Sequence, residues 1–249
     1  MTEAGTLVPV HLIRHGETSS YHSDSGLTDL GHAQASSKGV QLAGQLSPGA
    51  VVRLPHAPTA RAAETARGLR DGLAKGLRDR GVMDVRVGEP HVNEHFDNFR
   101  LWCDGQALDP TQAYAPYRHL RDSGSRAGLP GWFAEMDRFA TIQAAGDDPI
   151  TYWLTQPVQH FEPAATAVRR FWTGIRALVR DAQPGLQVFV STHSGCIRAL
   201  AAAAFGHDPG EPANTEDAVV RLAPAAERAV VSYRGHEVEL AVPTATTPP

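Results

Sequence analysis

The sequence has few cysteines, no excess of positive charge and no long apolar run. Only Cys103 and Cys196 occur among its 249 residues, and they form neither a Cys-x-x-Cys motif nor a disulfide framework. We therefore expect a reduced, cytoplasmic setting. The formal charge of −4 argues against a nucleic-acid partner, which would favour a basic surface. No apolar stretch is long enough to span a bilayer, and Glu3 ahead of a short apolar segment is untypical of a signal peptide. We expect no membrane partner.

The residues that are present suit a folded globule, since 42% are hydrophobic and 20% are charged. Short runs rich in apolar and β-branched residues alternate with amphipathic stretches. The predicted strands cover residues 8–15, 50–54, 84–90, 186–195, 218–224, 228–234 and 237–242, and the predicted helices cover 27–46, 59–81, 164–182 and 196–206. Thr28 is placed as the N-cap of the first helix. This alternation predicts an α/β fold, a three-layer sandwich with a mostly parallel central sheet flanked by helices.

The alternation fails between about residues 99 and 161. This stretch combines glycine, proline and aspartate with aromatic residues that suit a small core of their own, among them Trp102, Tyr114, Tyr117, Trp132, Phe133, Tyr152 and Trp153. A connection of this length is usually functional. We expect a cap inserted into one domain that spans residues 1–249. The oligomeric state stays open, with a homodimer as one option.

Charged and catalytic side chains gather where the predicted strands end. Arg14 and His15 end the first strand, Arg61 lies in the helix after the second, and His193 ends a later strand. Ligands of open parallel sheets bind beyond the carboxyl ends of the strands. Helix N-termini attract anions, and arginines bind phosphate with paired donors. The pattern predicts a phosphate site with a nucleophile in it.

Four motifs resemble those of the histidine phosphatase superfamily, which is also called phosphoglycerate mutase-like. They are RHGET (14–18), LTDLGHAQA (27–35), APTARAAETA (57–66) and STHSGCIRAL (191–200), in the family's order. The resemblance implies that His15 is the nucleophile that becomes phosphorylated, and that Arg14, Arg61 and His193 hold the phosphoryl oxygens. Thr18 and Ser194 complete the expected phosphate pocket, although Thr18 can equally support the turn.

The resemblance also implies a proton donor after the third strand. VNEHF (92–96) falls where the family places its acid, so Glu94 is the expected donor and Glu89 is its rival. HVNEH (91–95) also spells the H-x-x-E-H zinc motif, which needs both histidines on one face of a helix. Pro90 and the adjoining strand argue against such a helix. We expect no metal and no cofactor.

Two departures from the family's mutases bear on the reaction. Tyr21 stands where the mutases usually have asparagine, and the loop before the first helix is shorter. Both features favour a phosphomonoesterase that hydrolyses a small phosphorylated metabolite through phosphohistidine. The alternatives are a phosphoglycerate mutase-like phosphotransferase and a module that binds a phosphorylated ligand without turnover.

Overall fold

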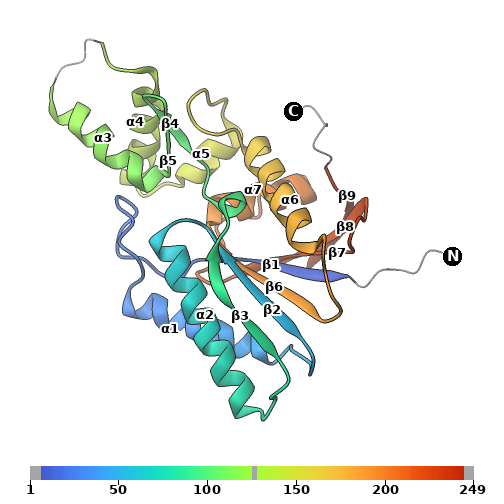
Figure 1. Ribbon diagram of the computed structural model, residues 1–249. Coiled ribbons are helices and arrows are strands. Elements are labelled where there is room, and N and C mark those ends of the chain that lie inside the picture. Colours follow the sequence, from blue (N-terminus) through green and yellow to red (C-terminus); the bar gives the residue numbers. More distant parts are fainter. Residues whose placement is uncertain (1–6, 125–127, 244–249) are drawn as a thin grey trace.

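A seven-stranded sheet forms the centre of the molecule (Figure 1). The computed structural model describes residues 7–124 and 128–243. The strand order is β3-β2-β6-β1-β7-β8-β9. The parallel strands are β1 (Val8–Arg14), β2 (Val51–His56), β3 (Arg86–Val92) and β6 (Leu186–Thr192). The antiparallel strands are β7 (Asp217–Leu222), β8 (Arg228–Tyr233) and β9 (His236–Ala241). The predicted α/β fold is confirmed, with the parallel strands at its centre and three antiparallel strands at one edge.

Helices cover both faces of the sheet. The helices of one face are α1 (Asp29–Ala43) and α2 (Ala60–Asp79), and those of the other are α6 (Ala164–Val179) and α7 (Ser194–Phe205). Alternate side chains of a strand point to opposite faces. Accordingly, Ile13 of β1 joins the apolar cluster under α1 and α2, whereas Leu12 joins the cluster under α6 and α7. Thr28 caps α1 as predicted, since its hydroxyl accepts from the Gly31 amide.

Residues 99–161, called the cap below, stand over the carboxyl edge of the parallel strands (Figure 1). The cap contains β4 (Leu101–Cys103), β5 (Gln106–Leu108), α3 (Pro110–Asp122), α4 (Gly131–Ala144) and α5 (Pro149–Thr155). Phe99 stacks on Trp153, with ring centroids 4.1 Å apart. Both rings belong to the same apolar cluster as Val10 of β1. The cap therefore packs on the sheet domain through a shared core.

No helix in the described ranges is long and apolar enough to cross a membrane.

Candidate active site

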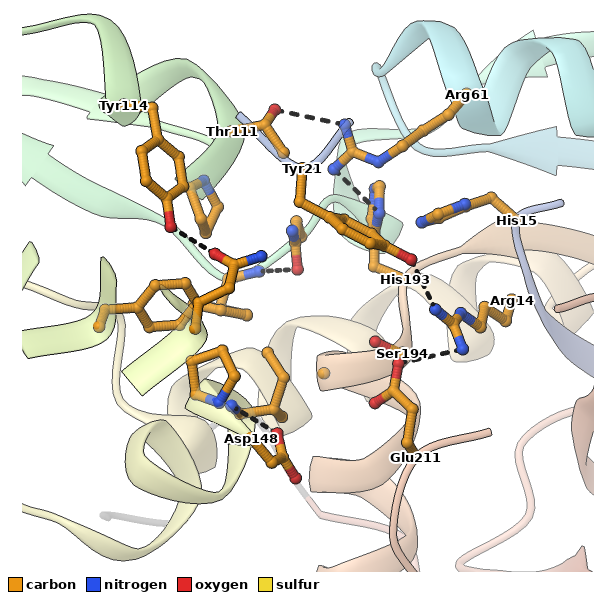
Figure 2. A pocket seen from close by; sticks show the side chains of 18 of the residues that line it. Arg14, His15, Tyr21, Arg61, Thr111, Tyr114, Asp148, His193, Ser194 and Glu211 are labelled. Carbon is orange, nitrogen blue, oxygen red and sulfur yellow. Dashed lines mark hydrogen bonds and ion pairs between the residues drawn. The ribbon is translucent and has the colours of Figure 1, made fainter. Parts of the chain in front are cut away.

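A cavity of about 450 Å³ lies between the carboxyl edge of the sheet and the cap (Figure 2). Five predicted site residues line it, namely Arg14, His15, Arg61, His193 and Ser194. They come from the ends of β1 and β6 and from the first turns of α2 and α7. Parallel strands end at one edge, so residues far apart in sequence meet there.

His15 follows β1 and is buried. Its Nδ1 lies 2.8 Å from the carbonyl oxygen of Gly16. A carbonyl only accepts, so Nδ1 carries the proton and Nε2 keeps a free lone pair. Gly16 packs tightly here, because a Cβ atom at this position would lie 2.5 Å from the carbonyl oxygen of Gly31 in α1. The turn thus fixes the imidazole with Nε2 as its nucleophilic atom.

Burial, together with the charges of Arg61 and Arg14, lowers the pKa of His15 to about 3. The imidazole is therefore neutral and nucleophilic at every pH above that value. We expect kcat/KM for p-nitrophenyl phosphate, corrected for the second ionisation of the substrate, to stay level as the pH falls below 6.5. The ratio kcat/KM reports the free enzyme, so bound phosphate does not disturb the measurement. An acidic limb centred near 6.5, with the fold intact by circular dichroism, would contradict this assignment.

Arg61 is held from several sides. Its Nη1 donates to Asp24 at 3.0 Å and to Thr111 at 3.4 Å, and its Nη2 donates to Asp109 at 2.9 Å and to His193 Nδ1 at 3.3 Å. Each of its four terminal N–H groups thus has a partner. The Nε atom is buried and, among the described residues, has none.

Arg14 shows the same feature on the other side of His15. Its Nη1 pairs with Glu211 at 3.0 Å, and its Nη2 donates to the Tyr21 hydroxyl at 3.0 Å (Figure 2). Its Nε is also buried without a partner in the described part of the chain. Unpaired buried donors are costly, and a ligand is one of the groups that can satisfy them. Two such donors beside a nucleophilic histidine mark an anion site.

His193 precedes the first turn of α7, and its ring centroid lies 5.4 Å from that of His15. Because Nδ1 accepts from Arg61, Nε2 carries the proton. Burial, Arg61 and His15 lower the pKa of His193 well below its ordinary value. The ring is therefore a neutral N–H donor, placed beside the free amides that begin α7.

The sequence of this site matches a known family. Residues 10–110 fit the model of the histidine phosphatase superfamily, branch 1. The match covers the first three of the four motifs, and the resemblance predicted from them is confirmed over these residues. No curated protein matches the sequence. Among solved structures, Bacillus stearothermophilus YhfR aligns with a TM-score of 0.52 at 16% identity, over 92% of this chain and 96% of its own.

Two further solved structures share the fold of this chain. Mycobacterial hydrolase 1 aligns with a TM-score of 0.50 at 19% identity, over 86% of this chain and 92% of its own. Mycobacterial hydrolase 2 also aligns with a TM-score of 0.50, at 18% identity over 97% of this chain and 94% of its own. The predicted family is confirmed, and the structural likeness extends the shared fold across the cap.

Thr18 and Glu94 lie elsewhere than predicted. The Thr18 hydroxyl donates to the Gly26 carbonyl at 2.8 Å and does not line the cavity, so it supports the turn. Glu94 begins a short 3-10 helix (Glu94–Phe96), where its side chain is 69% exposed and pairs with Arg100 at 3.3 Å. Glu89, the other candidate for the proton donor, is exposed and pairs with Arg70. Neither Glu94 nor Glu89 lines the cavity that contains His15.

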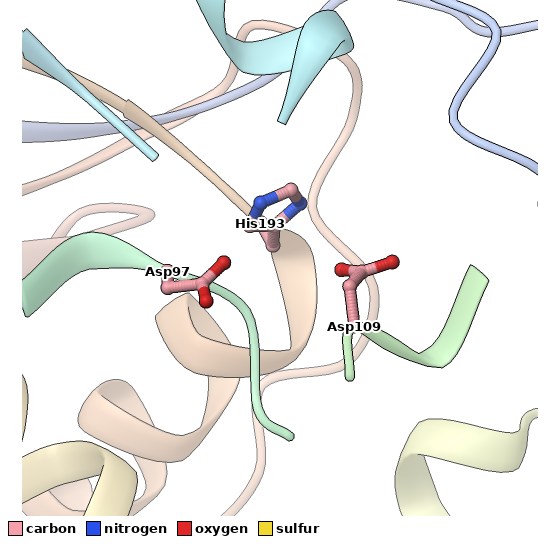
Figure 3. Close-up of side chains that lie close together, drawn as sticks. All are labelled: Asp97, Asp109 and His193. Carbon is pink, nitrogen blue, oxygen red and sulfur yellow. The ribbon is translucent and has the colours of Figure 1, made fainter. Parts of the chain in front are cut away.

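The loop that follows Glu94 reaches the site a few residues later. Asp97 lies beside His193 and Asp109 (Figure 3), and Asn98 lines the cavity. Burial raises the pKa of Asp97, although Arg100 opposes the shift. Arg61, with bonds from Thr111 and Asn98, lowers the pKa of Asp109 despite its burial. The pKa values of the two neighbouring carboxyls are thus shifted in opposite directions.

These three side chains are close enough to be considered as metal ligands. The oxygens of Asp109 already accept from Arg61, Asn98 and Thr111, and Asp97 accepts from Arg100. The guanidinium of Arg61 also lies against His193. Donor atoms that already accept hydrogen bonds, with a cation among them, fit a metal poorly. The HVNEH motif is divided between β3 and the 3-10 helix, so its histidines share no helical face.

Several site residues lie outside the predicted set. Asp24 binds Arg61 and the amide of Ala60 from the β1–α1 loop, and Glu211 binds Arg14 from the loop before β7. No local signal marks either of them. Asp109 does have one, since it opens α3 with a capping box to Gln112 and a proline at the next position.

Proposed function

We propose that this histidine phosphatase superfamily member is a phosphomonoesterase that works through a phosphohistidine at His15. The observation that supports this most is the free Nε2 of a neutral, buried His15 between two arginines with unpartnered Nε donors. Phosphoryl transfer needs an in-line nucleophile and positive charge around the equatorial oxygens. A module that only binds has no need of a nucleophile with a lowered pKa.

The reaction has two steps. In the first, a bond forms between Nε2 and phosphorus while the ester P–O bond breaks, and the departing oxygen takes a proton from an acid. In the second, the same group, now deprotonated, takes a proton from water as the water attacks phosphorus, the P–N bond breaks, and phosphate leaves with His15 neutral again. Arg14, Arg61 and the His193 N–H would hold the phosphoryl oxygens throughout. These donors supply the positive charge, so we propose that no metal takes part.

Release of inorganic phosphate from p-nitrophenyl phosphate tests the function directly. Absence of turnover would favour the binding module. Transfer of labelled phosphate between two sugar-acid acceptors, faster than its release to water, would favour the mutase. We propose hydrolysis because Tyr21 occupies one terminal nitrogen of Arg14 and extends into the cavity, where it narrows the space for a second phosphate.

We assign the proton-donor role to Asp97 in place of Glu94. It belongs to the same loop after β3, it lies beside His193, and burial raises its pKa. A general acid performs best when its pKa approaches the working pH. The upward shift of the Asp97 pKa is in that direction, whereas the side chain of Glu94 is mostly exposed to solvent.

Asp97→Asn is expected to slow phosphorylation by an alkyl phosphate by about 100-fold, with a much smaller loss for p-nitrophenyl phosphate. An alkoxide needs a proton to leave, whereas a nitrophenolate does not. Single-turnover rates isolate this step. Glu94→Gln is the control and should change both rates little. If Glu94→Gln or Glu211→Gln produces the unequal loss instead, the donor has been misassigned.

A further inference from the structure

The cavity has two chemically different halves. The half at the sheet edge contains His15, His193 and the two arginines. The half under the cap is mostly apolar or aromatic. Its apolar and aromatic lining residues are Phe99, Pro110, Tyr114, Phe139, Pro149 and Ile150, and its polar ones are Asn98, Thr111, Gln143, Asp147 and Asp148. The leaving group of a phosphate ester bound at His15 would extend into this second half.

The apolar wall begins directly beside the anion site. A Cβ atom at Gly195, in the first turn of α7, would lie 2.9 Å from the Phe99 ring and 3.5 Å from Cδ1 of Ile150. Any side chain at Gly195 would therefore collide with Phe99. Apolar atoms stand next to the helix N-terminus, where the ester oxygen would leave.

The polar atoms of the cap half are largely used within the protein. The Tyr114 hydroxyl donates to Oε1 of Gln143, and both residues line the cavity. The ring of His22 covers Tyr114 at a centroid distance of 4.4 Å. These contacts leave few donors for the hydroxyl groups of a sugar.

The charges of the lining disfavour a second anionic group. Among the described lining residues, the cations are Arg14 and Arg61, and the anions are Asp147, Asp148 and Glu211. Arg14 already pairs with Glu211, and Arg61 with two aspartates. A second phosphate or a carboxylate in the cap half would meet carboxylates without a free cation.

Arg198 of α7 does not supply that cation. Its side chain is buried and pairs with Asp148 at 2.7 Å and with Glu211 at 3.3 Å, and it also binds Asp208. The arginine neutralises the carboxylates from behind the cavity wall. Its charge also disfavours an amine as the group that those carboxylates would bind.

We infer that the substrate is the monophosphate ester of an uncharged, mainly apolar alcohol. This inference rests on the proposed phosphatase function and adds the class of leaving group to it. The volume of the cavity falls within the range of small-molecule sites. The alcohol part would bind through contact with Phe99, Phe139 and Ile150. The phosphate group would bind to the residues around His15.

A series of n-alkyl phosphates from methyl to hexyl tests this, because their alcohols leave with nearly equal ease. We expect kcat/KM to rise about threefold for each methylene until the cap half is filled, close to the value for full burial of a CH2 group. Two matched pairs test charge. Glycerol 3-phosphate should exceed 3-phosphoglycerate, and propyl phosphate should exceed aminoethyl phosphate, each by about tenfold or more.

Ile150→Asn should flatten the rise with chain length, whereas Ile142→Asn in α4, outside the cavity lining, should preserve it. Thermal melting checks that each variant folds, and the wild-type series alone decides the question if Ile150→Asn does not. The inference would be overturned if p-nitrophenyl phosphate is hydrolysed but kcat/KM does not change with alkyl chain length. A preference for 3-phosphoglycerate or aminoethyl phosphate would overturn it too. Either result would leave the phosphatase function standing. Absence of all hydrolysis would overturn the function itself.

Discussion

His15→Ala is expected to lower kcat for p-nitrophenyl phosphate by about 1,000-fold or more, because the variant has no atom that can accept the phosphoryl group. Binding of inorganic phosphate should survive in part, since Arg14, Arg61 and the first turn of α7 remain. Steady-state kinetics and calorimetry with phosphate separate the two effects. Retention of turnover within tenfold would remove His15 from the chemistry.

His56 provides a matched control for this substitution. It ends β2, is buried, and its Nδ1 lies 2.8 Å from the carbonyl oxygen of the following residue, as in His15. Burial also lowers the pKa of His56. Its side chain lies outside the candidate active site, beside Arg67 and Glu89. His56→Ala should therefore retain turnover within a few-fold, and a loss equal to that of His15→Ala would point to damage of the fold.

Arg61→Lys is expected to lower kcat/KM by roughly 100- to 1,000-fold, the scale seen when one donor to a developing anion is removed. Lysine keeps the positive charge but has no Nε–H group and no planar guanidinium. It cannot bind Asp24, Asp109 and His193 at once while presenting a further donor. The measurement is kcat/KM with p-nitrophenyl phosphate, together with the melting temperature.

Arg67→Lys makes the same exchange two turns along α2, at an exposed position, and should have no measurable effect. If both variants lose activity equally, charge on the helix in general is responsible. If neither loses activity, Arg61 holds the cap through Asp109 and takes no part in binding phosphate.

Much of this site was predictable from the sequence for a geometric reason. Arg14, His15 and His193 follow two adjacent parallel strands, and such strands end at one edge of a sheet. Arg61 follows β2, which pairs with the same central strand β6. The strand runs and the helix N-cap at Thr28 depend on local sequence alone, so they too could be predicted.

The proton donor is the position at which the proposal from the structure differs from the prediction from the sequence. The sequence places an acidic loop after β3, but the rotation of a single 3-10 turn decides which side chain enters. Phe96 is buried and Glu94 is exposed, while Asn98 lines the cavity and Asp97 lies beside His193. A motif match cannot resolve a difference of three residues when burial of a neighbouring aromatic ring determines the orientation.

The cap was predicted as an aromatic insertion, but its contribution to the cavity was not predictable. The helix α3 contains Pro116 and α5 has only seven residues, so they give weak periodic signals. Tyr117, Trp132 and Trp153 form core as expected, while Phe99, Tyr114 and Phe139 line the cavity. The division depends on packing between segments that are distant in sequence.

The proposed reaction requires a covalent phosphohistidine at His15. Mixing the enzyme with labelled p-nitrophenyl phosphate and quenching the mixture rapidly tests for it most directly. We expect label on the peptide that contains His15, stable in alkali and lost in acid, because the intermediate is a phosphoramidate. We also expect no label in His15→Ala. Label that survives acid, or that persists on the alanine variant, would contradict a phosphohistidine at His15.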